Sequence, residues 1–131
     1  MYAKGFYETN FEESITFFEN QIRQTEMNYE TCKMLAEMYF ANQNYSKCAR
    51  LCKRVLNQIV YREERFIYIS LDIMYMSSLK KTNKLTLRQR YSCYTRIARY
   101  KQFIKRHVGC RSPYYRKIEE CKLVLKASCI L

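Results

Sequence analysis

Apolar residues recur along the chain at helical spacing, and residues that break helices are rare. Cys93, Ile97, Tyr100 and Ile104 follow one another at intervals of three or four, which is the spacing of one face of a helix. The chain has two glycines and one proline. Sheet-rich folds need many turns and therefore many such residues, so their scarcity predicts an all-α fold of a few long helices.

The apolar pattern also repeats with a period of 34 residues. A segment that begins at Asn10 matches a segment that begins at Asn44 in aromatic, small and aliphatic positions. The matched pairs are Phe11 with Tyr45, Ser14 with Cys48, Phe18 with Cys52, and Ile22 with Leu56. A fixed period of this length is typical of stacked helical hairpins.

One repeat carries the residue pattern Leu35-Ala36, Tyr39, Tyr45, Cys48 and Cys52, and in this pattern the chain resembles the tetratricopeptide (TPR) family. The resemblance covers residues 10–79 and implies two helices joined by a tight turn at residues 43–44, with small side chains where the helices approach closely. Residues 1–9 are too few for a complete first helix, so the first repeat is predicted to begin near its second helix. The resemblance implies a short TPR-like array of five or six antiparallel helices.

The repeat fades after residue 79. A third step places Phe66, Ile69, Ser70 and Ile73 at first-helix positions, but residues 80–84 then read as a loop. A helix is predicted from Leu85 to Val108, with Gly109 ending it. Ser112 and Pro113 start a last helix as N-cap and first residue, with Leu123, Ala127 and Ile130 predicted to face inward. The prediction is thus one domain over residues 1–131, with repeats at 10–79 and a basic helical pair at 80–131.

Charge is distributed unevenly over this pattern. Residues 1–44 hold three lysines and arginines against seven glutamates, a net charge of −4, whereas residues 45–131 hold twenty-one cations against five acids, a net charge of +16. A field of this strength attracts polyanions such as RNA, DNA or anionic lipid.

The densest basic segment lies between Leu79 and Arg111, where eleven cations occur in 33 residues without an acid. Like charges at helical spacing repel one another, and phosphates would offset that repulsion. Tyr91 and Tyr94 lie among these cations and could stack on bases or pack in the core, whereas Tyr100 is predicted to pack in the core. The predicted RNA-binding residues are Lys80, Lys81, Lys84, Arg88, Arg90, Arg96, Arg99, Lys105, Arg106 and Arg111.

Residues for other chemistry are scarce. The single histidine, His107, does not suit acid–base or triad catalysis, and two glycines cannot build a phosphate-binding loop. His107 with Cys110, and Cys48 with Cys52, are pairs without a C-x-x-C partner, so we expect no metal and no cofactor. The seven cysteines and the lack of an apolar leader predict core cysteines in a reducing compartment, the cytosol or the nucleus, of which the cytoplasm fits the ribosome hypothesis.

Two functional hypotheses follow. The first is a non-catalytic factor bound to the ribosome or its RNA, with the acidic N-terminal end contacting a basic ribosomal protein. In size, charge and composition the chain is similar to the small ribosome-dormancy (hibernation) factors of microsporidia, which would imply steric occlusion of a tRNA or mRNA path.

The alternative is a TPR-type adaptor, or a subunit of a larger complex, that binds an acidic peptide. A resemblance to 14-3-3 proteins, which also bind peptides, falls under this second hypothesis. Neither hypothesis involves a membrane or a small-molecule substrate.

Overall fold

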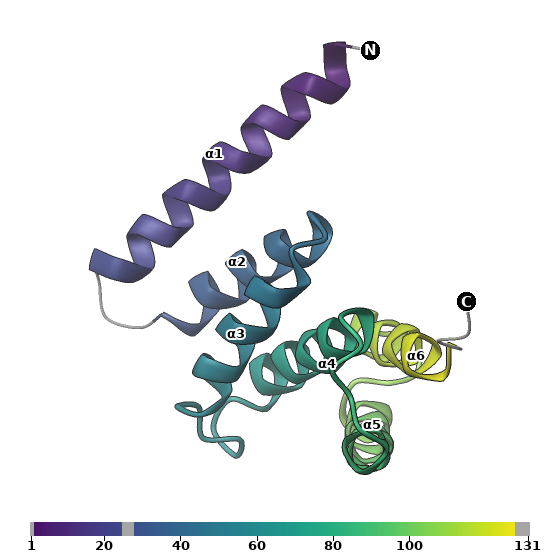
Figure 1. Ribbon diagram of the computed structural model, residues 1–131. Coiled ribbons are helices and arrows are strands. Elements are labelled where there is room, and N and C mark those ends of the chain that lie inside the picture. Colours follow the sequence, from purple (N-terminus) through teal and green to yellow (C-terminus); the bar gives the residue numbers. More distant parts are fainter. Residues whose placement is uncertain (1, 25–27, 128–131) are drawn as a thin grey trace.

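The computed structural model describes residues 2–24 and 28–127, and these form helices without any strand (Figure 1). The all-α helical-hairpin architecture predicted from the sequence is therefore confirmed. The six helices of the described residues are α1 (Tyr2–Gln24), α2 (Tyr29–Ala41), α3 (Tyr45–Leu56), α4 (Arg65–Lys81), α5 (Leu87–His107) and α6 (Pro113–Lys126).

Local sequence signals explain where several helices begin. The Asn28 side chain accepts a hydrogen bond from the backbone N–H of Thr31 and caps α2. Thr86 and Gln89 form a reciprocal capping box at the start of α5. Ser112 caps α6 as predicted, ahead of the proline at the first helical position.

The turns between helices use residues that adopt a left-handed backbone conformation. Gln43 has a φ of 62° in the predicted tight turn between α2 and α3. Gly109 has a φ of 107°, and its N–H donates to the carbonyl of Ile104, so it ends α5 as predicted. Asn83 has a φ of 56° between α4 and α5. In these three connections the chain can therefore reverse and start the next helix.

Two hydrophobic clusters hold the array together, and α4 contributes to both. The first joins α1, α2 and α3, and includes the stripe Leu35, Ala36 and Tyr39 that the repeat predicted to be buried. Cys48 and Cys52 of α3 are fully buried in it. The second cluster joins α4, α5 and α6 around Ile69, Ile73, Met76, Cys93, Ile97, Tyr100, Ile104, Ile118, Cys121 and Leu125. Helix α4 is the common wall of the molecule, since it contacts α2, α3, α5 and α6.

Helix α1 runs as one helix from Tyr2 to Gln24, so a single helix precedes α2 among the described residues, where a complete first repeat would have two. Two predictions about helix limits and faces were wrong. Helix α4 continues to Lys81, so the loop lies over 82–86 rather than 80–84. On α6, Leu123 is 68% exposed and Ala127 is exposed; Ile118, Cys121 and Leu125 form the inner face instead. Ile130 lies outside the described residues.

The cysteines are mostly core residues, as predicted. Those buried among the described residues are Cys32, Cys48, Cys52, Cys93 and Cys121. Cys110 is exposed, and Cys129 lies outside the described residues. Burial raises the pKa of Cys121 to about 11, so that its thiol stays protonated in the fold. None of the described helices combines the length and the apolar character that crossing a bilayer requires.

Candidate nucleic-acid interface

The ten predicted RNA-binding cations lie on the end of α4, on the loop that follows it, on α5 and on the loop before α6. Helix α5 lies at the edge of the array, where it packs on α6 and α4 (Figure 1). One side of α5 therefore faces the protein and the other faces solvent. The predicted cations divide accordingly into those held by the protein and those that are exposed.

Lys80 is held inside the protein. Its residue is 6% exposed, and its Nζ donates a hydrogen bond of 2.8 Å to the carbonyl oxygen of Ala127 at the end of α6. A buried ammonium needs such an acceptor in place of water. Lys80 is therefore a buried structural cation, contrary to its predicted place on the RNA surface.

Arg96 is occupied by a carboxylate of the protein itself. Its Nε lies 2.8 Å from Oδ2 of Asp72, and a terminal nitrogen lies 3.4 Å from Oδ1. Its other terminal nitrogen donates to the hydroxyl of Ser92 at 2.8 Å. Asp72 is 3% exposed, so the pair is shielded from solvent on the carboxylate side. Arg96 ties α5 to α4 and is a structural cation, contrary to its predicted role at the RNA surface.

Tyr100 completes this buried network. Its hydroxyl donates to Oδ2 of Asp72 at 2.5 Å, and the residue is 2% exposed. Burial raises the pKa of Tyr100 far above its ordinary value, and the nearby negative charge of Asp72 raises it further. The predicted core position of Tyr100 is confirmed.

Two other predicted cations are intermediate between these groups. Arg90 is half-buried, and its Nε has no hydrogen-bond partner among the described residues. Lys81 is exposed, but its ammonium lies 5.5 Å from the centre of the Tyr45 ring, in a cation–π contact. Arg90 is thus only partly open to solvent, and Lys81 is exposed but engaged by an aromatic ring.

The solvent side of α5 carries an unbroken polar and cationic strip, which we call the outer face of α5. All its members are exposed, and none of its arginines forms an ion pair with a described carboxylate. From its first arginine to its last, the strip is about 27 Å long at 1.5 Å per residue. It consists of Arg88, Tyr91, Thr95, Arg99, Gln102 and Arg106.

Three more predicted cations lie close to this strip in the sequence. Lys105 is exposed on α5, and Lys84 and Arg111 are exposed in the loops before and after it. None of them is paired with a carboxylate in the described part of the chain. Lys101, the remaining cation of the basic segment, is bound to Glu119 at 2.6 Å.

The tyrosines within and just after the basic segment also divide into exposed and packed side chains. Tyr91 is 76% exposed on the outer face, beside Arg88 one turn earlier. Tyr94 is half-buried and packs against the second cluster. Tyr114 packs on Phe66 with 5.1 Å between ring centres. Of these three, Tyr91 is the ring that an unpaired base could reach.

Sequence reasoning missed a second group of exposed cations, on α3. Lys47, Arg50, Lys53 and Arg54 are all exposed, and the helix contains no acid. The signal is present in the sequence, because these residues lie opposite the buried Cys48 and Cys52 at helical spacing. The 34-residue repeat points to the buried positions of this segment and says nothing of the exposed ones.

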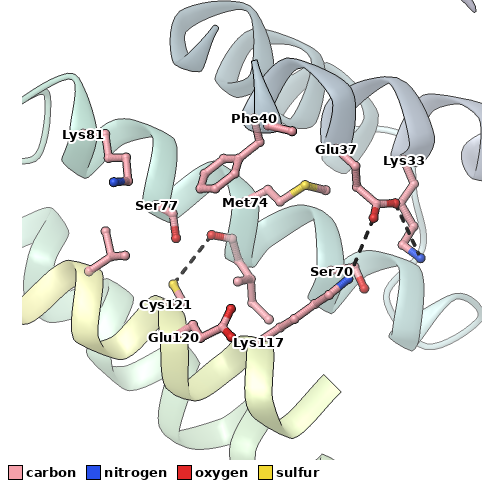
Figure 2. Close-up of a pocket in the computed structure, with 13 residues that line it drawn as sticks. Lys33, Glu37, Phe40, Ser70, Met74, Ser77, Lys81, Lys117, Glu120 and Cys121 are labelled. Atoms are coloured by element: carbon pink, nitrogen blue, oxygen red, sulfur yellow. Dashed lines mark hydrogen bonds and ion pairs between the residues drawn. The ribbon is translucent and has the colours of Figure 1, made fainter. Parts of the chain in front are cut away.

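A groove between α2, α4 and α6 is the place where an adaptor could hold a peptide. It encloses about 390 Å³, and Figure 2 shows Phe40 and Met74 beside polar and charged groups. Glu37 is paired with Lys117 at 3.8 Å and with Lys33 at 4.0 Å across one end (Figure 2). These pairs close that end of the groove with charges of both signs.

The two predicted candidate pairs for other chemistry lie in different parts of the fold. His107 is exposed at the end of α5, and its ring packs on Phe103 with 4.5 Å between centres. Cys48 and Cys52 are enclosed in the first cluster. Within residues 2–24 and 28–127, no group of three or more histidines, cysteines or acids is arranged to hold a metal ion.

The fold and its surface define a class, an all-α hairpin array with a cationic outer helix. No family model, curated protein or solved structure matches the chain.

Proposed function

We propose that this protein is a non-catalytic, cytoplasmic RNA-binding factor that attaches to ribosomal RNA through the outer face of α5. The observation that carries the proposal is the set of arginines Arg88, Arg99 and Arg106, which are exposed over about 27 Å without a carboxylate partner in the described chain. A solvated helix commonly mixes both signs of charge, and α5 contains no acid.

Phosphate groups offset the repulsion between these arginines and the neighbouring cations of α5. Each phosphate that an arginine neutralises releases condensed counterions, which makes the affinity fall steeply with salt. Arginine also binds phosphate oxygens with two parallel N–H groups. Tyr91, exposed between Arg88 and Thr95, adds a ring on which a base can stack.

A ribosome-bound protein of this kind acts by occupying space. Six packed helices on an RNA surface would block the path of tRNA or mRNA, as in ribosome-dormancy factors, and no bond need be made or broken. The groove between α2, α4 and α6 would remain available to a protein neighbour. TPR-like architecture is part of this proposal, and the buried stripe of Leu35, Ala36 and Tyr39 supports it.

The test replaces Arg88, Arg99 and Arg106 by glutamine, which keeps helix propensity and removes charge. Binding of labelled ribosomal RNA is measured at several KCl concentrations, and co-sedimentation with ribosomal subunits is followed in parallel. The slope of log affinity against log salt should become shallower by roughly 2 to 3, at about 0.7 to 0.9 per phosphate contact.

A matched control removes three exposed charges outside α5, those of Arg62, Arg116 and Lys126. It should change affinity through long-range electrostatics alone and leave the slope close to that of the wild type. If the α5 variant and the control behave alike, the outer face is not the interface. Binding that is insensitive to salt and is displaced by an acidic peptide would support the adaptor hypothesis instead.

A further inference from the structure

Helix α3 presents a second cationic surface, the α3 surface, made of Lys47, Arg50, Lys53 and Arg54. These residues occupy four of the twelve positions of the helix, and no acid accompanies them. All four are exposed, because Cys48, Cys52 and Val55 take the opposite side into the first cluster. The helix is thus strongly divided between an apolar side and a cationic side.

A hollow of about 520 Å³ lies between this surface and the end of α4. Arg50, Lys53 and Arg54 line one side of it, and Lys84 contributes from the loop after α4. The lining contains no carboxylate, and Ser46, Asn57 and Gln58 add polar groups. Such a lining suits an anion that accepts several hydrogen bonds.

The cations of the α3 surface differ in how they are engaged. The ammonium of Lys53 lies 5.6 Å from the centre of the Tyr75 ring, and that of Lys47 lies 5.9 Å from the Tyr39 ring. Arg50 and Arg54 form no ion pair with a described carboxylate. On the far side of α3 they border a second hollow that also includes Glu19, whose carboxylate accepts a hydrogen bond from Tyr39. The acid-free side is therefore the one toward α4.

The loop between α4 and α5 connects this hollow to the outer face of α5. Lys84 lines the hollow, and Arg88 begins the outer face four residues later. Four residues span at most about 14 Å even when fully extended. A single RNA could therefore pass from one surface to the other without leaving the protein.

Resting on the proposed function, we infer that the α3 surface binds a second stretch of phosphodiester backbone of the same RNA. The two surfaces then hold the RNA along α3, past Lys84 and along α5. This assigns phosphate contacts to Arg50 and Arg54, which the sequence did not single out.

The test uses the full chain with three charge-removing variants of equal size. The first is Arg50→Gln with Arg54→Gln, the second is Arg99→Gln with Arg106→Gln, and the third is the α6 control, Arg116→Gln with Lys126→Gln. Affinity for labelled ribosomal RNA is measured against KCl concentration, and thermal melting confirms that each variant is folded. A combined variant joins the α3 and α5 substitutions.

Each of the first two variants should make the salt slope shallower by roughly 1.4 to 1.8, and the combined variant by roughly twice that amount. If the α3 variant matches the α6 control while the α5 variant does not, the inference is overturned and the proposed function stands. If the α3 variant makes the salt slope shallower and the α5 variant matches the control, RNA binding by the α3 surface is supported. The proposed RNA binding by the outer face of α5 is then overturned. If the wild-type protein does not bind RNA at all, both are overturned.

Discussion

The two sides of α5 contain the same kind of residue in opposite circumstances. Arg96 faces α4 and is bound by Asp72, whereas Arg99, three residues later, faces solvent without an ion pair to a described carboxylate. In the sequence the two are alike, as members of one acid-free segment. The comparison teaches that a run of cations must be divided by helical face before it is assigned to a ligand.

A single acid binds both Arg96 and Tyr100 on the inner side of α5. Asp72 is the one carboxylate that either α4 or α5 contains, and it accepts hydrogen bonds from both Arg96 and Tyr100. A buried charge is tolerated when it is paired and hydrogen-bonded. The outer side has no such arrangement, so its charges remain available to a partner.

The strongest test of this division is Asp72→Asn, which keeps the shape of the side chain and removes its charge. Arg96 would then be left without a counter-charge, and the free energy of unfolding should fall by about 3 to 5 kcal/mol, near the lower figure because Arg96 is 27% exposed. Urea unfolding followed by circular dichroism measures this change.

The control for that experiment is Glu120→Gln, which removes an exposed carboxylate from α6. It should change the free energy of unfolding by no more than about 0.5 kcal/mol. Equal effects of the two substitutions would mean that the Asp72 network does not hold α5 to α4. The inner and outer arginines would then not differ in what they contribute to stability.

Much of α5 could be predicted from the sequence because its determinants are local. The spacing of Cys93, Ile97, Tyr100 and Ile104 defines the buried side, and Gly109 defines the end. Both follow from backbone geometry within one helix. Helical spacing alone therefore puts Arg99 and Arg106 on the solvent side, where the fold has them.

The partners of the inner cations could not be predicted because they come from distant parts of the chain. Asp72 precedes Arg96 by 24 residues, and the carbonyl of Ala127 follows Lys80 by 47. No local spacing pairs such residues. On α6 the error was different: Leu123 and Leu125 are both apolar, they lie on different sides of the helix, and the packing on α4 and α5 selected Leu125.

The inner side should also respond to alkaline pH through Tyr100. Because the fold raises the pKa of Tyr100, the folded protein keeps this proton at pH values where the unfolded chain, with a pKa of about 10, loses it. Stability due to this group is therefore complete below pH of about 10 and falls above it, by at most about 1.4 kcal/mol per pH unit. Urea unfolding at several pH values from about 9 to 11 measures the slope.

The substitution Tyr100→Phe should make that slope shallower than the wild-type slope. Ile97→Val, which costs about 1 kcal/mol without removing a titrating group, controls for general destabilisation and should keep the wild-type slope. Identical slopes for the Tyr100→Phe variant and the wild type would show that the buried hydroxyl is not protected by the network.

The smallest change in the free energy of unfolding is expected for substitutions on the outer side of α5. This change distinguishes the outer arginines from the inner ones. Arg99→Gln with Arg106→Gln should leave the free energy of unfolding within about 0.5 kcal/mol, whereas Arg96→Gln should lower it by several times as much because Asp72 loses its partner. In low salt the outer variant should be more stable than the wild type by a few tenths of a kcal/mol, roughly the repulsion that the arginines exert on their cationic neighbours. That gain should vanish near 1 M KCl, where charges are screened within about 3 Å. A loss above about 1 kcal/mol on the outer side would mean that these arginines stabilise the fold itself, and a phosphate partner would no longer be needed to explain them.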